Sequence, residues 1–176
     1  LKTKGHRVSF DLEKHNSLND LIVSLDCSYM TNGLNSLRLI PTGTVDFIWS
    51  QAVLEHVKKS KFLETMRELR RIIAPHGVCS HEIDFKDHLG GALNHLRFSE
   101  TIWESKIMSN SGFYTNRIRY PEMSQIFKDV GFNVEVLSRS SWDVLPTRKQ
   151  RMSAPFRRLA DEDLRTAVVQ VLLRPS

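Results

Sequence analysis

The stretch VDFIWSQAVLEHV, residues 45–57, changes from the pattern of a buried strand to that of a helix at the polar pair Ser50 and Gln51. In an open α/β sheet, ligands bind just outside the carboxyl ends of the strands, where the chain turns from strand to helix. We therefore expect Ser50 and Gln51 to lie at a binding edge.

Turn signals bound this unit on both sides. The run Pro41-Thr42-Gly43-Thr44 precedes it, and Ala74-Pro75-His76-Gly77 ends the helix that follows. Residues 60–73 are predicted to form that helix, because Phe62, Met66, Leu69 and Ile73 recur at spacings of three and four, and Ser60 can cap its amino end.

The next strand is predicted at residues 78–85. Alternation places Cys79, His81, Ile83 and Phe85 on one side, and Asp84 falls near the ligand edge. A long connection, residues 86–120, then delivers Tyr114 and its neighbours, and we expect it to recognise substrate.

Further elements are expected on both sides of this block. We predict strands at 7–10, 27–31, 132–138 and 165–173, and helices at 19–25 and 121–130. The last two strands would form an antiparallel edge.

Residues 45–57, together with Leu69 to Val78, resemble the class I S-adenosylmethionine-dependent methyltransferases of the type 11 kind, and the likeness extends more loosely over residues 27–174. The resemblance implies an α/β fold: a Rossmann-like sheet with helices on both faces and an antiparallel strand at the C-terminal edge. It also implies S-adenosylmethionine (SAM) as cofactor and methyl transfer as the reaction.

The resemblance assigns candidate residues to this site. Cofactor contacts would come from Asn32, Gly33, Ser50, Gln51 and Ala52, while His56, His81, Asp84 and Tyr114 would orient or deprotonate the methyl acceptor. Asn32 is equally well explained as a turn residue. A capping or packing role explains His56 equally well.

One family feature is missing. No two glycines are separated by a single residue, so the Gly-x-Gly cofactor loop cannot be drawn. We expect a partial domain truncated at its N-terminus, with a remnant or linker (1–26), cofactor-side strands and helix (27–85), a substrate-side insertion (86–120), and a C-terminal helix with the final strands (121–176).

A truncated sheet would leave an apolar edge at Phe47 to Trp49. Such an edge pairs with another strand. We expect residues 7–10 or the strand at 27–31 to cover it, or two copies of the chain to form a homodimer through it. Alone, the chain is expected to bind cofactor weakly or not at all.

The net charge of +5 and the pI of about 9.4 suggest a nucleic-acid partner. The segment around Arg148 to Arg158 is densely basic but poor in the aromatic residues of a single-strand platform, so a small-molecule acceptor is favoured over nucleic acid. The alternative function is a non-catalytic binding or assembly module that engages acidic partners through this segment.

Other classes are disfavoured. No apolar run approaches the roughly 20 residues that span a bilayer, and the two cysteines make no disulfide framework, so we expect a cytoplasmic protein with no membrane contact. Ser50 lacks the flanking glycines of a hydrolase elbow. His81, His88 and His95 lack the spacing of a compact metal site, so no metal is predicted.

Overall fold

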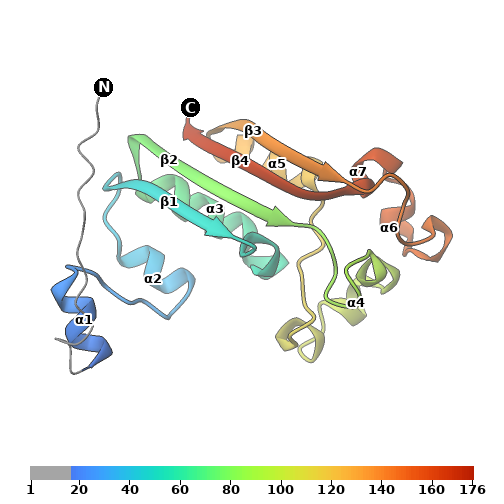
Figure 1. The fold of residues 1–176 in the computed structure, drawn as a ribbon, viewed down its shortest axis with the longest axis horizontal. Helices are drawn as coiled ribbons and strands as arrows, with labels where there is room; N and C mark the ends of the chain where they lie inside the picture. Colours follow the sequence, from blue (N-terminus) through green and yellow to red (C-terminus); the bar gives the residue numbers. More distant parts are fainter. Residues whose placement is uncertain (1–16) are drawn as a thin grey trace. The chain divides into compact units, whose positions relative to one another are not determined.

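The computed structural model describes residues 17–176 (Figure 1). They divide into two compact units with the boundary between Ser36 and Leu37, and each unit is described by itself. The strand predicted at residues 7–10 lies outside the described residues.

The first unit contains α1 (Leu18–Ser24), which confirms the helix predicted at 19–25. Ser17 caps it by accepting a hydrogen bond from the Asp20 backbone N–H at 3.1 Å. The strand predicted at residues 27–31 is wrong. These residues are exposed and join no ladder, and the Cys27 N–H instead donates to the Ile22 carbonyl oxygen at 3.0 Å, which closes the helix. A strand forms only where another backbone pairs with it.

The second unit is built on a four-stranded sheet. Its strands are β1 (Val45–Gln51), β2 (Ile73–Asp84), β3 (Phe132–Ser141) and β4 (Thr166–Pro175), in the order β1-β2-β4-β3. The strands β1 and β2 are parallel, whereas β4 runs antiparallel to both β2 and β3. The predicted α/β class and the antiparallel strands at the C-terminus are confirmed.

Two helices, α3 (Lys59–Ile72) and α5 (Tyr120–Asp129), pack on one face of this sheet (Figure 1). The apolar residues whose spacing predicted α3 are the ones that are buried. Phe62, Met66 and Leu69 all face the sheet. The core also includes Met123 and Phe127 from α5 and, from β2 and β4, Cys79, Ile83, Val169, Val171 and Leu173.

The amino end of α3 is not capped as the sequence predicted. Its N-cap residue is Lys58, and no side chain of the cap position bonds to the helix. Instead, the Tyr114 hydroxyl accepts a hydrogen bond from the Lys59 backbone N–H at 3.0 Å. A distant loop therefore satisfies one of the free N–H groups that every helix leaves at its start.

The turn expected at Ala74-Pro75-His76-Gly77 lies inside β2 as an irregularity. In the register of the ladder, Val45 lies opposite Ile73 and Phe47 lies opposite Val78, so β2 has more residues than β1 over this part of the pairing. The extra residues bulge out of the ladder, which continues regularly from Val78 onward.

Short elements gather where β2 ends and β4 begins (Figure 1). They are α4 (Glu100–Trp103), α6 (Ala154–Arg157) and α7 (Asp161–Arg165), with the 3₁₀ turns η3 (Asn94–Arg97), η4 (Met108–Asn110) and η5 (Lys149–Arg151). A second core of Leu93, Leu96, Met152, Phe156 and Leu164 joins the long connection after β2 to the basic segment before β4. α2 (Leu34–Leu39) crosses the boundary between the two units.

The face of the sheet opposite α3 and α5 presents large apolar side chains. Phe47 and Trp49 in β1 are 61% and 64% exposed, and Leu137 in β3 is 51% exposed. Within residues 17–176, β1 pairs only with β2, so its other edge has no strand beside it. Among the described helices, none combines the length and the apolar character needed to cross a bilayer.

Gly77 tests the packing of the bulge. A β-carbon at this position would lie 2.9 Å from the Val45 carbonyl oxygen and 2.8 Å from Ile73 Cδ1, so Gly77→Ala forces the β1–β2 junction apart. We expect a loss of about 1–3 kcal/mol in the free energy of unfolding, measured by urea denaturation. Gly112→Ala is the matched control, since nothing lies within 4 Å of a β-carbon there. Equal stability of the two variants would contradict the prediction.

Candidate functional site

Ser50 and Gln51 lie at the carboxyl end of β1, as predicted, but their side chains point to opposite faces of the sheet. Ser50 Oγ lies 2.7 Å from His81 Nδ1 on the face that α3 and α5 cover. Burial lowers the pKa of His81 to about 4, so this imidazole is neutral at physiological pH. Ser50 and His81 thus form a buried polar pair between β1 and β2.

Gln51 belongs to a polar row on the open face. It donates to Glu82 Oε1 at 3.2 Å, Gln170 donates to Glu82 Oε2 at 2.6 Å, and Ser138 donates to Gln170 at 3.1 Å. One residue from each of the four strands takes part. A shallow hollow of about 280 Å³ adjoins this row and is lined by Trp49, Gln51, Ser80, His81, Glu82, Leu137 and Gln170.

Ala52 ends the strand in a left-handed backbone conformation, with φ of 51°. A residue with a β-carbon pays a steric cost there, commonly about 1 kcal/mol or more. The Ala52 N–H is fixed by the Glu82 carbonyl oxygen at 3.0 Å. The sharp bend leaves Gln51 and Ala52 exposed at the carboxyl edge of the sheet.

His56 lies in η2 (Leu54–His56), directly after this bend. Its Nδ1 is 3.0 Å from the Tyr114 carbonyl oxygen, and its ring centre is 4.9 Å from that of His88. His88 Nδ1 lies 3.2 Å from the Gly112 carbonyl oxygen. Because a carbonyl oxygen only accepts, each Nδ1 must donate, and each neutral ring therefore keeps Nε2 as its acceptor.

Tyr114 and Asp84 are held by local hydrogen bonds. The buried Tyr114 hydroxyl donates to Glu104 Oε2 at 2.9 Å while accepting from Lys59, and burial raises the pKa of this hydroxyl. Asp84 ends β2, and its Oδ1 accepts from the Lys86 N–H at 2.8 Å. Both groups flank the carboxyl edge of β1 and β2.

Asn32 and Gly33 belong to the other unit. Gly33 has a φ of 50°, the Asn32 N–H donates to Ser36 Oγ at 3.0 Å, and the Asn32 carbonyl oxygen accepts from the Asn35 N–H at 3.1 Å. These contacts form the turn that starts α2. In residues 17–176, no three or more His, Cys, Asp or Glu side chains are grouped so that they could hold a metal ion.

Glu55 is a candidate site residue that the sequence did not single out. It is 3% exposed, and within the described chain neither carboxylate oxygen has a hydrogen bond of standard geometry. Desolvation raises the pKa of Glu55 to about 7, against the opposing effect of the Glu55 and Asp84 backbone N–H groups. Buried carboxyl groups that titrate near neutrality cluster at functional sites. The only sequence signal was its place next to His56.

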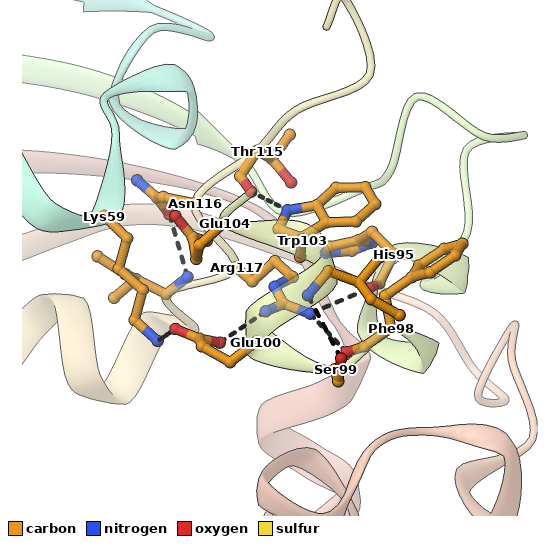
Figure 2. Close-up of polar contacts among 12 residues, drawn as sticks. Lys59, His95, Phe98, Ser99, Glu100, Trp103, Glu104, Thr115, Asn116 and Arg117 are labelled. Carbon is orange, nitrogen blue, oxygen red and sulfur yellow. Dashed lines mark hydrogen bonds and ion pairs between the residues drawn. The ribbon is translucent and has the colours of Figure 1, made fainter. Parts of the chain in front are cut away.

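Two buried arginines frame this region. Arg117 donates to the Phe98 carbonyl oxygen at 2.8 Å and to Glu100 at 2.6 Å, and it packs over the Trp103 ring at 5.4 Å (Figure 2). Arg119 donates to four carbonyl oxygens, those of Phe85 at 2.9 Å, Asp163 at 3.3 Å, Leu164 at 3.0 Å and Thr166 at 2.6 Å.

Asn116, between these arginines, binds the η2 turn directly. Its side-chain amide donates to the carbonyl oxygens of Leu54 at 2.8 Å and Val57 at 3.0 Å, and its backbone N–H donates to that of Glu55 at 2.7 Å. The long connection is thereby locked onto the end of β1. The two segments that the sequence assigned to cofactor and substrate meet here.

Comparison with known proteins supports a methyltransferase likeness. Residues 9–80 match a family of methyltransferase domains. No curated protein sequence matches the chain.

Several solved structures are similar to this chain. YcgJ from Bacillus subtilis has 11% identity and a TM-score of 0.53, over 90% of this chain and 76% of that one. A SAM-dependent methyltransferase from Archaeoglobus fulgidus has 10% identity and a TM-score of 0.49, over 84% and 66%. The partner protein in a complex with the Trm112 methyltransferase activator from Haloferax volcanii has 15% identity and a TM-score of 0.47, over 85% and 61%. The chain spans less than two thirds of the latter two proteins.

Glu55→Gln tests the burial of this carboxyl group. Because the folded-state pKa of about 7 exceeds the ordinary 4.5, the folded protein holds the proton more tightly than the unfolded chain does. The stability gained from the neutral form is complete below pH 4.5, falls as the pH rises, and is lost above about pH 7. Wild type should therefore lose roughly 2–3 kcal/mol relative to Glu55→Gln between pH 4.5 and 7.

Thermal unfolding across this pH range measures the difference between the two proteins. Glu122→Gln, which changes an exposed carboxylate on α5, is the control and should follow wild type. Parallel stability curves for wild type and Glu55→Gln would show that Glu55 titrates normally.

Proposed function

We propose that this chain, which has the fold of the class I SAM-dependent methyltransferases, takes part in methyl transfer from SAM to a small-molecule acceptor. The carboxyl edge of β1 and β2 would be the place of reaction. Residues 45–57, which decide that edge, fall within the sequence match to methyltransferase domains.

The observation that supports this proposal is the order and direction of the strands in the sheet. Two parallel strands are followed by an antiparallel strand inserted next to β2, in the order β1-β2-β4-β3. This arrangement agrees with the likeness to YcgJ, whose TM-score of 0.53 supports a shared fold. A strained bend at Ala52 then exposes backbone and Gln51 where ligands of open α/β sheets bind.

Residues at the end of β1, in the second unit, would form one wall of a SAM site. Gln51 and Ala52 would contact the methionine and methyl region of SAM. Ser50 would hold the end of β1 in place through its hydrogen bond to His81. Asn32 and Gly33 are proposed for the adenine. Bound SAM supplies a methyl group already activated on a sulfonium, so the protein has mainly to align the acceptor and exclude water, an effect of about 7–11 kcal/mol.

The acceptor side would be formed by the η2 turn and the long connection. The His56 ring lies beside that of His88, and Asp84 lies at the end of β2. Tyr114 holds His56 through its backbone carbonyl and α3 through its hydroxyl. We therefore assign orientation of the acceptor to Tyr114 and proton removal to His56 or Asp84.

Cofactor binding tests the proposal. We expect SAM at millimolar concentration to shift the backbone NMR signals of Gln51, Ala52 and their neighbours, since a chain without a Gly-x-Gly loop binds weakly. Gln51→Ala should weaken this binding roughly fivefold through loss of one polar contact. Gln125→Ala, on the exposed side of α5, is the control. Shifts confined to other parts of the chain would remove the proposed site.

A homodimer through the free edge of β1 is a second proposal. If two β1 strands pair antiparallel about Ile48, Phe47 of one copy faces Trp49 of the other, and aromatic cross-strand pairs stabilise sheets. Light scattering should show a dimer that Trp49→Glu dissociates and that Val144→Glu, at an exposed apolar position outside the sheet, leaves intact. A monomeric wild type would exclude this dimer.

The alternative of a non-catalytic module that engages acidic partners has one supporting observation. Arg148, Arg151, Arg157 and Arg158 are all exposed in the segment before β4. Lys149 in the same segment is already paired with Asp161 at 2.7 Å. Absence of any SAM response in the experiment above would favour this alternative.

A further inference from the structure

A small cavity lies behind the η2 turn, at the carboxyl ends of β1 and β2. Its volume is about 10 Å³, and its walls are Glu55, Asp84, Phe85, His95, Thr115, Asn116, Arg117, Ile118 and Arg119. A space of this size is at the lower limit for one water molecule, which needs two to four polar partners. The cavity can therefore receive a single heavy atom such as oxygen.

Hydrogen-bond acceptors line one part of this cavity. Both carboxylate oxygens of Glu55 and the hydroxyl of Thr115 are buried and, among the described residues, lack hydrogen-bond partners. Thr115 is fixed by its backbone, since its carbonyl oxygen accepts from Trp103 Nε1 at 2.7 Å (Figure 2). Its hydroxyl remains free to serve the cavity. A buried carboxylate without a partner costs free energy unless a donor reaches it.

Donors line another part. The terminal nitrogens of Arg117 and Arg119 are bound to carbonyl oxygens and to Glu100, but the Nε atoms of both are buried and without a partner in the described chain. A guanidinium whose terminal nitrogens are already bonded cannot swing away to satisfy Nε elsewhere.

The occupant must therefore both donate and accept hydrogen bonds. A metal ion would be repelled by the two guanidinium groups, and an anion by Glu55 and Asp84. From this geometry we infer a site for one hydroxylic oxygen, which donates its hydrogen to Glu55 and accepts from the arginine Nε–H groups. The oxygen belongs either to a water molecule or to the hydroxyl of the methyl acceptor, and the second case rests on the proposed function.

In the second case Glu55, in place of His56 or Asp84, is the proton acceptor of the reaction. The acceptor's O–H bond breaks, and the proton goes to a carboxylate oxygen of Glu55. The electron pair left on the acceptor oxygen forms the new bond to the methyl carbon. The bond between that carbon and the sulfur of SAM breaks, and its electron pair stays on sulfur. The raised pKa of Glu55 suits proton transfer near neutral pH.

The charges that face Glu55 agree with this role. Asp84 and Glu82 of β2 disfavour its ionised form. His95 is uncharged, since burial lowers its pKa to about 4, and Arg117 and Arg119 line the opposite wall.

The experiment uses 4-nitrophenol, whose absorbance reports its own ionisation, and 4-nitroanisole, which has no O–H. If the acceptor hydroxyl is the occupant, wild type should bind the phenol at least roughly tenfold more tightly than the anisole and shift its ionisation. Glu55→Gln and Thr115→Val should lose that preference, and Glu122→Gln should keep it. This readout does not involve SAM, so it can fail while SAM binding succeeds.

If water is the occupant, neither compound is preferred, but NMR magnetisation transfer should show a long-lived water near the Asn116 amide in wild type and not in Thr115→Val. If neither the phenol preference nor the bound water is found in wild type, the site does not exist. Should Glu55→Gln fail to fold, ¹³C-labelled glutamate in wild type decides the proton role, because a Glu55 titration midpoint at the ordinary 4.5 would overturn it.

Discussion

The parallel pairing of β1 with β2 is the constraint on which the rest of this structure depends. It places the carboxyl ends of both strands at one edge, where Gln51 lies opposite Glu82 and Ser50 opposite His81. Within the second unit, every residue of the candidate site is either at this edge or in a segment bound to it. The bulge at Pro75 to Gly77 lets the short β1 and the longer β2 reach that edge in register.

Buried polar side chains hold the loops at this edge. Arg119 connects the end of β2 to the start of β4 through carbonyl oxygens, and Asn116 fixes the η2 turn. Such buried donors are costly to desolvate unless their partners are in place, so the loops have one favourable arrangement. The cost of the left-handed bend at Ala52 and of the left-handed Arg117, with φ of 59°, is offset by these contacts.

The two faces of the sheet have different consequences. One is sealed by α3 and α5 around a continuous apolar core, while the other presents Phe47, Trp49 and a polar row that ends at Ser138. Within residues 17–176, the apolar edge expected at Phe47 to Trp49 has no strand beside it. What covers it decides whether this edge is an interface.

The sequence alone determined the strand-to-helix change at Ser50 and Gln51, the helix at α3, and the alternation that buries Cys79 and Ile83, because these patterns are local and have a fixed period. Tertiary structure decided the rest. The strand expected at 27–31 did not form because no backbone pairs with it, and the cap of α3 comes from Tyr114, a residue far along the chain. Glu55 became a candidate only through its burial, since desolvation depends on what the folded chain packs around a carboxyl group and leaves no mark in the sequence near it.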